Sequence, residues 1–245
     1  MEKKINKLLI VSLILAAVFG GVAFLLRDLP HESGAEEKVS FSIQEYLSID
    51  VQRLDVSLIP YDETEIMVEY KNDRPLEFEI GDNELMITEN VKFVVSLFAG
   101  DRSDFGVKIY LPKTAYRDIS IYTGTGSVNV GNISCQKLSA VTETGDIKIE
   151  SMRYLSSVTS TSGRISANVD KIVQDTSFLN RDGDIDLVLP PESSVAVDFK
   201  TTDGECKTDL ISGHISGSYL YAFNGGKRRI DVTAEHGTFT IKERT

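Results

Sequence analysis

Beyond residue 40 the chain alternates apolar and polar residues in short runs, which is typical of half-buried β-strands. Glu65–Tyr70 and Val107–Leu111 are examples, and the segments between such runs are rich in Asp, Asn, Gly and Pro, which favour turns. No stretch of this region sustains the 3.6-residue period of an amphipathic helix. The pattern therefore predicts an almost entirely β domain.

A second pattern, a repeat, lies on top of this alternation. A polar run, a Gly and then alternating apolar residues recur, most clearly in Thr144–Ile149, Ser162–Ile165 and Asp182–Leu187. Glycines 126, 145, 163, 183 and 204 are 19, 18, 20 and 21 residues apart, and a looser copy contains Gly237. A near-constant spacing of about 20 residues is typical of a solenoid.

Alignment on the glycine predicts which side chains face inward. Apolar residues prevail at the second and fourth positions after it and at the fifth and seventh before it. Each unit is then two short strands joined by a polar corner. Hairpins need no common register from unit to unit, whereas stacked rungs do. We therefore expect a β-solenoid, or single-stranded β-helix, of about 20-residue rungs. Cys206 falls at an inward position and is expected to be a small buried hydrophobe.

The glycines are predicted to form one corner of every rung. A corner favours a positive φ angle, which glycine adopts without steric cost. The expected corner residues are Gly126, Gly145, Gly163, Gly183, Gly204 and Gly237.

The N-terminal segment predicts a membrane anchor. Leu8–Leu26 contains 19 residues without a charge and follows Lys3, Lys4 and Lys7. As a helix it would span about 28 Å, close to the ~30 Å hydrocarbon core of a bilayer. A cleaved signal peptide is the alternative, but Gly21-Val22-Ala23 is a poor cleavage site. The lysines favour a single-pass protein with a cytoplasmic N-terminus and an extracytoplasmic C-terminal domain.

The predicted domain organisation follows from these patterns. Residues 1–27 form a cytoplasmic tip and transmembrane anchor, and residues 28–40, which include His31, form a linker. Residues 41–245 form the solenoid, with irregular rungs over 41–115 and regular, glycine-punctuated rungs over 116–245. The segment 90–105 interrupts the strands with an apolar insert, either a loop tucked under the sheet or an interface.

Composition excludes several classes of function. The net charge of −11 opposes binding to nucleic acid, which requires clustered Lys and Arg. Two Cys and three His lie far apart, so neither a disulfide framework nor a Cys/His metal site is indicated. No catalytic motif is present in the sequence, so we assign no catalytic residue and expect no cofactor.

Acidic residues around one glycine are the candidates for a binding site. They are Asp182, Asp184, Asp186 and, one copy later, Asp203. Three interpretations remain open: a solvated charged face, a Ca²⁺ or glycan site built from carboxylate oxygens, and paired carboxylates for glycoside hydrolysis. Lys148, Arg164 and Lys207 interleave with them and favour the solvated face through cross-rung pairs.

Three sequence features resemble a known family. They are the Thr-Gly-Asp-Ile-Lys-Ile type of rung, Val-Lys-Ile-Tyr-Leu-Pro at 107–112, and the closing segment 213–233 with its Gly-His-Ile-Ser-Gly. Together they resemble the bacterial "putative adhesin" β-solenoid domain family. With the N-terminal anchor, the layout is similar to LiaG-type membrane proteins associated with cell-envelope stress systems in Gram-positive bacteria. The resemblance brings no catalytic residues.

The leading hypothesis is a membrane-anchored, non-enzymatic extracytoplasmic module, adhesin-like or part of an envelope stress response. Its partner would be a cell-wall or envelope component, or another protein. One alternative is a polysaccharide-acting or Ca²⁺-dependent glycan-binding β-helix that uses the acidic ladder. Another is a cytoplasm-facing scaffold that polymerises end to end through open rungs.

Overall fold

A computed structural model of the chain describes residues 35–71, 75–90, 106–191, 193–208, 215–216 and 219–244. These residues belong to one compact unit that begins at Ala35. The predicted anchor, His31 and most of the 90–105 insert lie outside the described residues. Within the described ranges, no helix is long and apolar enough to cross a membrane.

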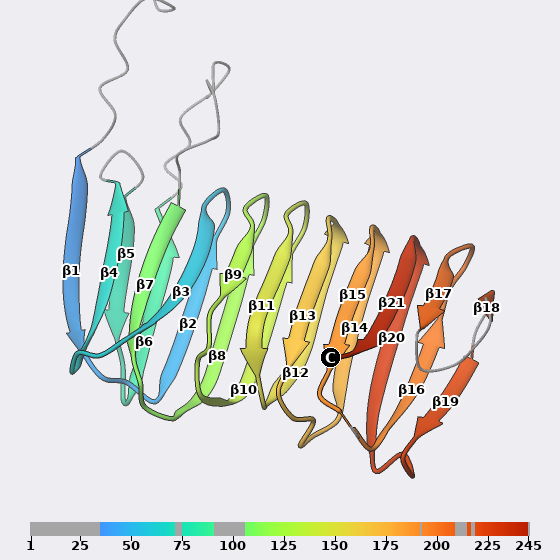
Figure 1. Ribbon diagram of the computed structural model, residues 1–245. Coiled ribbons are helices and arrows are strands. Elements are labelled where there is room, and N and C mark those ends of the chain that lie inside the picture. The colour runs from blue at the N-terminus through green and yellow to red at the C-terminus, as the bar shows by residue number, and fades with distance from the viewer. Residues whose placement is uncertain are drawn as a thin grey trace, which may run out of the picture. The chain divides into compact units, whose positions relative to one another are not determined.

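The described strands form two sheets (Figure 1). In spatial order, sheet A contains β1 (Glu36–Ser42), β4 (Glu65–Lys71), β7 (Gly106–Pro112), β3 (Asp55–Tyr61), β9 (Val128–Val130), β11 (Ile147–Met152), β13 (Ile165–Val169), β15 (Ile185–Leu189), β21 (Thr238–Glu243), β17 (Glu205–Thr208) and β18 (Ile215–Ser216). Sheet B contains β19 (Tyr219–Phe223), β16 (Val195–Lys200), β20 (Arg228–His236), β14 (Thr176–Asp182), β12 (Leu155–Ser162), β10 (Cys135–Thr142), β8 (Tyr116–Thr123), β2 (Tyr46–Val51), β6 (Glu84–Glu89) and β5 (Leu76–Ile80).

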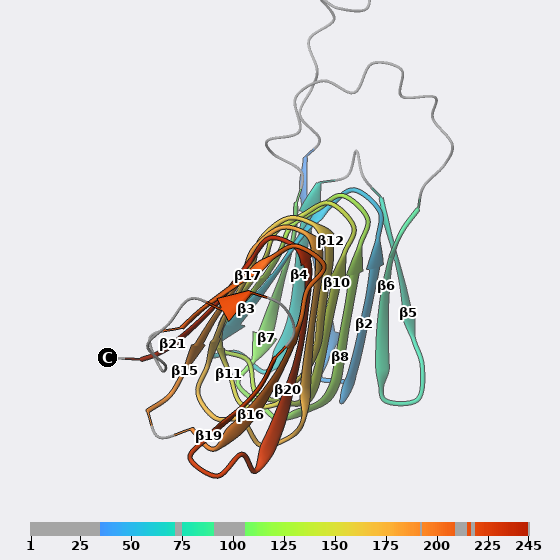
Figure 2. The same ribbon diagram turned by 90° about the vertical axis from the view of Figure 1, so that its right-hand side faces the viewer.

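Each rung is one strand of sheet B, a corner, and one strand of sheet A. β10 leads into β11, for example, and both pair in parallel with the rung before: Ala140 lies beside Ile121, and Ile147 beside Val128. Seen from the end of the stack, the two sheets face each other across a single core (Figure 2). The predicted all-β, solenoid-like architecture is confirmed for the part of the chain that the structure describes.

The inward positions predicted from the glycine alignment are nearly all buried, and Cys206 is 3% exposed, as expected. Ser156 differs, because Leu138 pairs with Leu155 whereas Ser139 pairs with Ser157. Ser156 therefore sits in a β-bulge, and Leu155 takes the inward place at 1% exposure. The bulge keeps an apolar side chain in the core where the regular register would bury a hydroxyl.

The rungs do not all stack in chain order, which corrects the arrangement that the spacing of the glycines implies. The last rung of the chain, β20–β21, lies between β14–β15 and β16–β17. At the other end, β2–β3 lies between β6–β7 and β8–β9. Only β8 to β15 stack in chain order.

Antiparallel strands close both ends of the parallel stack. β1 and β4 continue sheet A beyond β7, and β5 continues sheet B beyond β6. At the opposite end β18 pairs with β17, and β19 pairs with β16. β1 begins at Glu36, so the last residues of the expected linker 28–40 are part of a strand.

Candidate functional site

The glycines of the repeat form a continuous column across the rungs. A Cβ atom on Gly145 would collide with the carbonyl oxygen of Gly126, and one on Gly183 would collide with that of Gly163. The column runs, in spatial order, through Gly126, Gly145, Gly163, Gly183, Gly237 and Gly204. Neighbouring rungs approach each other so closely here that no side chain fits.

Steric room, more than backbone conformation, is the reason for these glycines. Only Gly163 and Gly237 of the column have positive φ, at 148° and 150°. The expectation that every corner requires a positive φ was therefore wrong for Gly126, Gly145, Gly183 and Gly204. Close approach of two backbones is a separate demand that glycine alone meets.

A second column stands three residues before the glycines. Thr142 Oγ1 donates a hydrogen bond to the carbonyl oxygen of Gly126 at 2.9 Å and accepts one from the Gly145 N–H at 3.0 Å. Thr142 thus ties its own corner to the corner of the preceding rung, and Ser160 and Asn180 likewise donate to the carbonyl oxygens of Gly145 and Gly163. The buried members are Thr123, Thr142, Ser160 and Asn180.

Sequence reasoning missed this column, although a signal was present. The alternation of each strand makes this position inward-facing, and yet it carries Thr, Thr, Ser, Asn and Thr in successive repeats. Polar residues recurring at an inward position indicate an internal hydrogen-bonded ladder, because buried polar groups require partners.

Aspartates that follow the glycines bind backbone N–H groups of the neighbouring rung. Asp146 Oδ1 accepts a hydrogen bond from the N–H of Arg164 at 2.7 Å, and Asp184 Oδ1 accepts one from Thr238 at 2.9 Å. Charge-assisted bonds to backbone N–H groups are short and strong. These carboxylates therefore have a structural role at the corner.

The acidic candidates are placed among cations and next to the corner. Arg164 places Nη2 3.3 Å from Asp184 Oδ2 and Nε 3.5 Å from Asp186 Oδ2. Arg181 Nε lies 3.8 Å from Asp182 Oδ2. Asp203 is separated from the rung of Asp182 by the inserted rung β20–β21. No group of three or more His, Cys, Asp or Glu in the described residues could hold a metal ion. Ca²⁺ binding by Asp182, Asp184, Asp186 and Asp203 stays a prediction of the sequence.

His236 stands between two of these aspartates. It pairs with Asp182 in the strand register and places Nδ1 2.6 Å from Asp203 Oδ1. The pKa of His236 is raised, first by the hydrogen bond to Asp203 and then by the charge of that carboxylate, with Asp182 and Glu235 adding smaller effects. The contact links the inserted rung to β16–β17.

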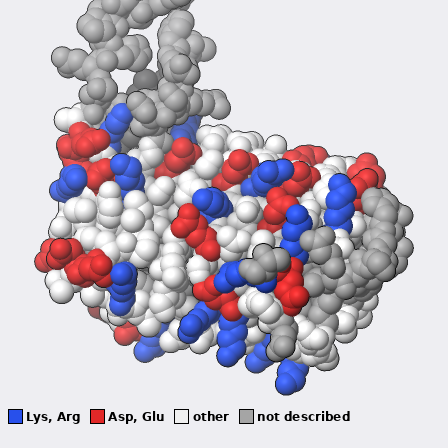
Figure 3. Space-filling model, viewed as in Figure 1, with Lys and Arg blue, Asp and Glu red and all other residues white. Residues whose placement is uncertain are grey.

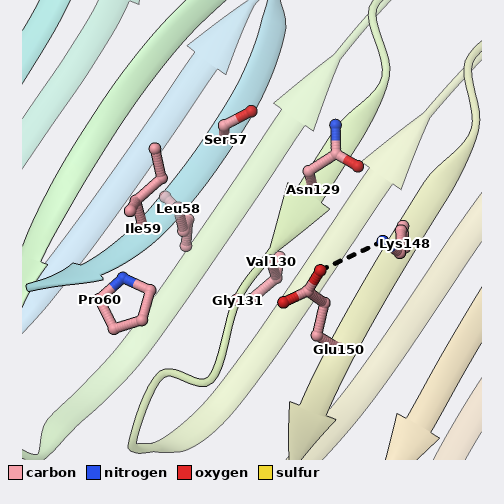
Figure 4. A pocket seen from close by; sticks show the side chains of 9 residues that line it. All are labelled: Ser57, Leu58, Ile59, Pro60, Asn129, Val130, Gly131, Lys148 and Glu150. Carbon is pink, nitrogen blue, oxygen red and sulfur yellow. Dashed lines mark hydrogen bonds and ion pairs between the residues drawn. The ribbon is translucent and has the colours of Figure 1, made fainter.

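The outer face of sheet A has a groove of about 210 Å³ where β9 is only three residues long (Figure 4). β9 ends just before Gly131, and residues near the ends of β3 and β11 line the two sides of the gap that it leaves. A side chain at position 131 would collide with Pro60. The 3.1 Å ion pair of Lys148 with Glu150 borders the groove on the β11 side. The other lining residues are Ser57, Leu58, Ile59, Pro60, Asn129, Val130 and Gly131.

Two overlapping segments, residues 44–153 and 116–242, match the Toastrack DUF4097 family and together span nearly the whole described unit. The chain belongs to the Toastrack DUF4097 family. The "putative adhesin" β-solenoid resemblance of the sequence is thereby confirmed at the level of the family. No curated protein matches the chain.

Two solved structures are similar to this Toastrack domain. A "putative cell adhesion protein" from Clostridium sporogenes has a TM-score of 0.53 at 15% identity, over 86% of this chain and 99% of that chain. A "putative adhesin" from Bacteroides fragilis has a TM-score of 0.37 at 13% identity, over 86% of this chain and 98% of that chain. The first of these supports the fold; at these identities neither transfers a function.

The thiols of the Toastrack domain lie in its core. Both Cys135 and Cys206 are free and buried. Burial raises the pKa of the Cys135 thiol to about 12 and that of Cys206 to about 11. Both thiols are therefore protonated at neutral pH, and they pack as small apolar side chains.

Proposed function

We propose that the chain is a membrane-anchored, extracytoplasmic interaction module of the cell envelope, which acts by binding and not by catalysis. The observation that carries this proposal is the row of outward side chains on sheet A. Parallel pairing in constant register places equivalent residues of successive rungs side by side, and solenoid proteins use such extended surfaces for binding.

The row crosses seven neighbouring strands from β3 to β17. Its members are Ser57, Asn129, Lys148, Ser166, Asp186, Thr240 and Lys207. At about 4.8 Å between strands, the six steps cover roughly 29 Å. The groove of Figure 4 lies at one end of this row, because Ser57, Asn129 and Lys148 also line the groove. An extended partner could thus lie along the row with one end in the groove.

Two further observations support an envelope location. The uncharged segment 8–26 follows three lysines, the arrangement of an anchor with a cytoplasmic N-terminus. The protein of similar fold from Clostridium sporogenes is called a "putative cell adhesion protein". In this proposal the Toastrack domain stands outside the membrane and meets envelope components.

Protease treatment of intact cells tests the topology. The full chain carries one tag at the N-terminus and a different tag at the C-terminus. We expect external protease to remove the C-terminal tag while the N-terminal tag remains intact until the cells are opened. Protection of the C-terminal tag in intact cells would reverse the topology and support the cytoplasmic scaffold instead.

Photo-crosslinking in the same cells tests the binding face. A photoreactive residue replaces Asn129 or Ser166 in the row, and the matched control replaces Thr159 on the outer side of β12 in sheet B. We expect crosslinks to one defined partner from the two sheet A positions and none from the control. Equal crosslinking from all three positions would contradict the assignment of this face.

A further inference from the structure

A cleft of about 530 Å³ lies at the edge of the stack opposite the glycine column. We call this edge the lower edge, as it appears in Figure 1. Three connections form the cleft: residues 170–173 after β13, residues 190–191 and 193–194 between β15 and β16, and residues 227–228 at the start of β20. The cleft is distinct from the groove of Figure 4 and from the acidic corner.

Cations dominate this cleft. Lys171, Lys227 and Arg228 line it, all three are exposed, and among the described residues none of them has an ion-pair partner. Asp170, the one carboxylate among the described lining residues, is already held by Arg244 at 2.9 Å and by Ser151. Figure 3 shows Lys and Arg gathered along the lower edge beneath the later strands. Glu192 belongs to the middle connection but lies outside the described residues.

Contacts between the connections hold the backbone from which these cations project. Ser194 Oγ donates to the carbonyl oxygen of Asn224 at 2.5 Å and accepts a hydrogen bond from the Lys227 N–H at 3.3 Å. The N–H of Arg229 donates to Asp175 Oδ1 at 2.9 Å. Ile172 packs against the hydrophobic core. The three positive charges are therefore presented by connections that are attached to each other and to the core.

The acidic candidates of the glycine edge lie far from the cleft. The acidic candidates Asp182, Asp184 and Asp203 lie at the glycine edge, beyond strands such as β13 and β15 with five residues each. Five residues span about 16 Å, which exceeds the Debye length of about 8 Å at physiological ionic strength. The aspartates of the glycine edge therefore add little to the field at the cleft, which is set by the charges of the lower edge.

We propose that this cleft binds a phosphate-bearing ligand, either the headgroup of an anionic phospholipid or a soluble polymer of phosphate groups. Phosphate fits the observed groups because Arg offers paired N–H donors and Lys offers a compact charge, both of which are common phosphate ligands. The cleft has room for one headgroup or one short stretch of polymer. This inference deepens the proposed function by giving the module a ligand class, although the cleft itself does not depend on the membrane topology.

The test uses the purified full chain in a non-ionic detergent, with binding measured by calorimetry. The probes are polyphosphate, short-chain phosphatidylglycerol, short-chain phosphatidylcholine and polyglutamate of matched length. The cleft variant is Lys171→Gln/Lys227→Gln/Arg228→Gln. The matched control, Arg53→Gln/Arg181→Gln/Lys200→Gln, removes the same charge from exposed positions outside the cleft and outside the sheet A row.

We expect the wild-type chain to bind at least one phosphate probe at least tenfold more tightly than polyglutamate and phosphatidylcholine. The cleft variant should lose at least tenfold in affinity, and the control variant should bind like the wild type. Binding of polyphosphate identifies the polymer source, and binding of phosphatidylglycerol alone identifies the headgroup.

Three results would overturn the proposal: no binding of either phosphate probe, equal binding of polyglutamate, or equal weakening in both variants. The last would mean that affinity follows net charge and not the cleft. Circular dichroism of both variants confirms that each is folded. A negative result here leaves the cell-surface topology and the sheet A row untouched, since protease treatment and crosslinking test those separately.

Discussion

Gly145 shows how one residue type can be required by its neighbour in the next rung. Its φ is not positive, and a Cβ atom there would nonetheless meet the carbonyl oxygen of Gly126. We expect Gly145→Ala to lower the free energy of unfolding by about 1–3 kcal/mol, because two rungs must move apart. Urea denaturation of the full chain measures this.

Gly81 offers the matched control for that substitution. An added Cβ there would meet only the Cβ of Glu84, at 4.0 Å, which is ordinary contact. Gly81→Ala should therefore change the unfolding free energy by less than about 0.5 kcal/mol, as expected of a surface substitution that disturbs no contact. Equal effects of the two substitutions would show that the column has more room than its geometry indicates.

His236 makes the joint between two rungs sensitive to pH. Because Asp203 raises its pKa above the ordinary value of about 6.5, the folded chain holds the proton more tightly than the unfolded chain. The ion pair of His236 with Asp203 therefore stabilises the fold fully below pH 6.5. This stabilisation is lost as the pH rises through the pKa of His236 in the folded chain. We expect the urea concentration at the midpoint of unfolding to be higher for the wild type than for His236→Asn at pH 5.5. This difference should shrink as the pH rises towards 8.5.

His31 and His214 are present in both proteins, so their titration cancels in this comparison. Asp203→Asn serves as the second variant and should abolish most of the same pH dependence. A difference between wild type and His236→Asn that stays constant from pH 5.5 to 8.5 would contradict the ion pair.

At the level of single residues, the alternation of the chain was enough to predict the core. Ile147 and Ile149 both face inward, because side chains alternate between the two faces of a strand and the corner at Gly145 determines which residues take the inner face. The role of Thr142 was not predictable from alternation, since the same position would suit an apolar residue. Its hydrogen bonds depend on the distance between rungs, which is a property of the stack and not of the repeat.

Among the elements, the inserted rung has an unexpected place for the end of a chain. β20 and β21 have neighbours on both sides, whereas β5 and β19 lie at the edges of sheet B. Amides with partners on both sides open only with larger parts of the fold. We expect residues 228–243 to exchange backbone hydrogens as slowly as β12 and far more slowly than β5 or β19.

Hydrogen exchange with mass spectrometry measures this order, with peptides from β12 as the internal reference. Chain ends usually fray first, so rapid exchange in 228–243 is the outcome that would contradict the topology.

The place of this rung was beyond the reach of the repeat. All six glycine corners lie in the same register. The corner residues therefore do not specify which rung packs against which. What decides the order is the path between rungs: β18 and β19 run back along the outside of β17 and β16 before β20 begins. Neither antiparallel strand contains a glycine corner, and the spacing of the glycines therefore carries no information about them.

On the scale of the whole molecule, the inserted rung joins the central rungs to β16–β17. A chain that stops at residue 227 lacks β20 and β21, which leaves β14 and β16 without a shared neighbour and Phe199 without its stacked partner Phe239, 5.6 Å away. We expect this truncation to make the whole 35–227 region sensitive to protease, instead of only its last rungs.

The control chain stops at residue 243 and loses only the last two residues, including the pairing of Arg244 with Asp170. Limited proteolysis of both chains, followed by mass spectrometry of the fragments, gives the comparison. A resistant fragment that covers 106–189 in the chain ending at 227 would show instead that the central rungs fold independently.

The reversed strands at both ends also determine how such a domain can change its length during evolution. New rungs cannot be appended outside β1 and β5 or outside β18 and β19, because parallel rungs do not continue from those antiparallel strands. Duplication of one unit within 116–189, by contrast, adds a strand to each sheet and leaves both closures and the inserted rung intact. Each duplication would lengthen the domain by about 4.8 Å, so the central rungs are a spacer adjustable in fixed steps.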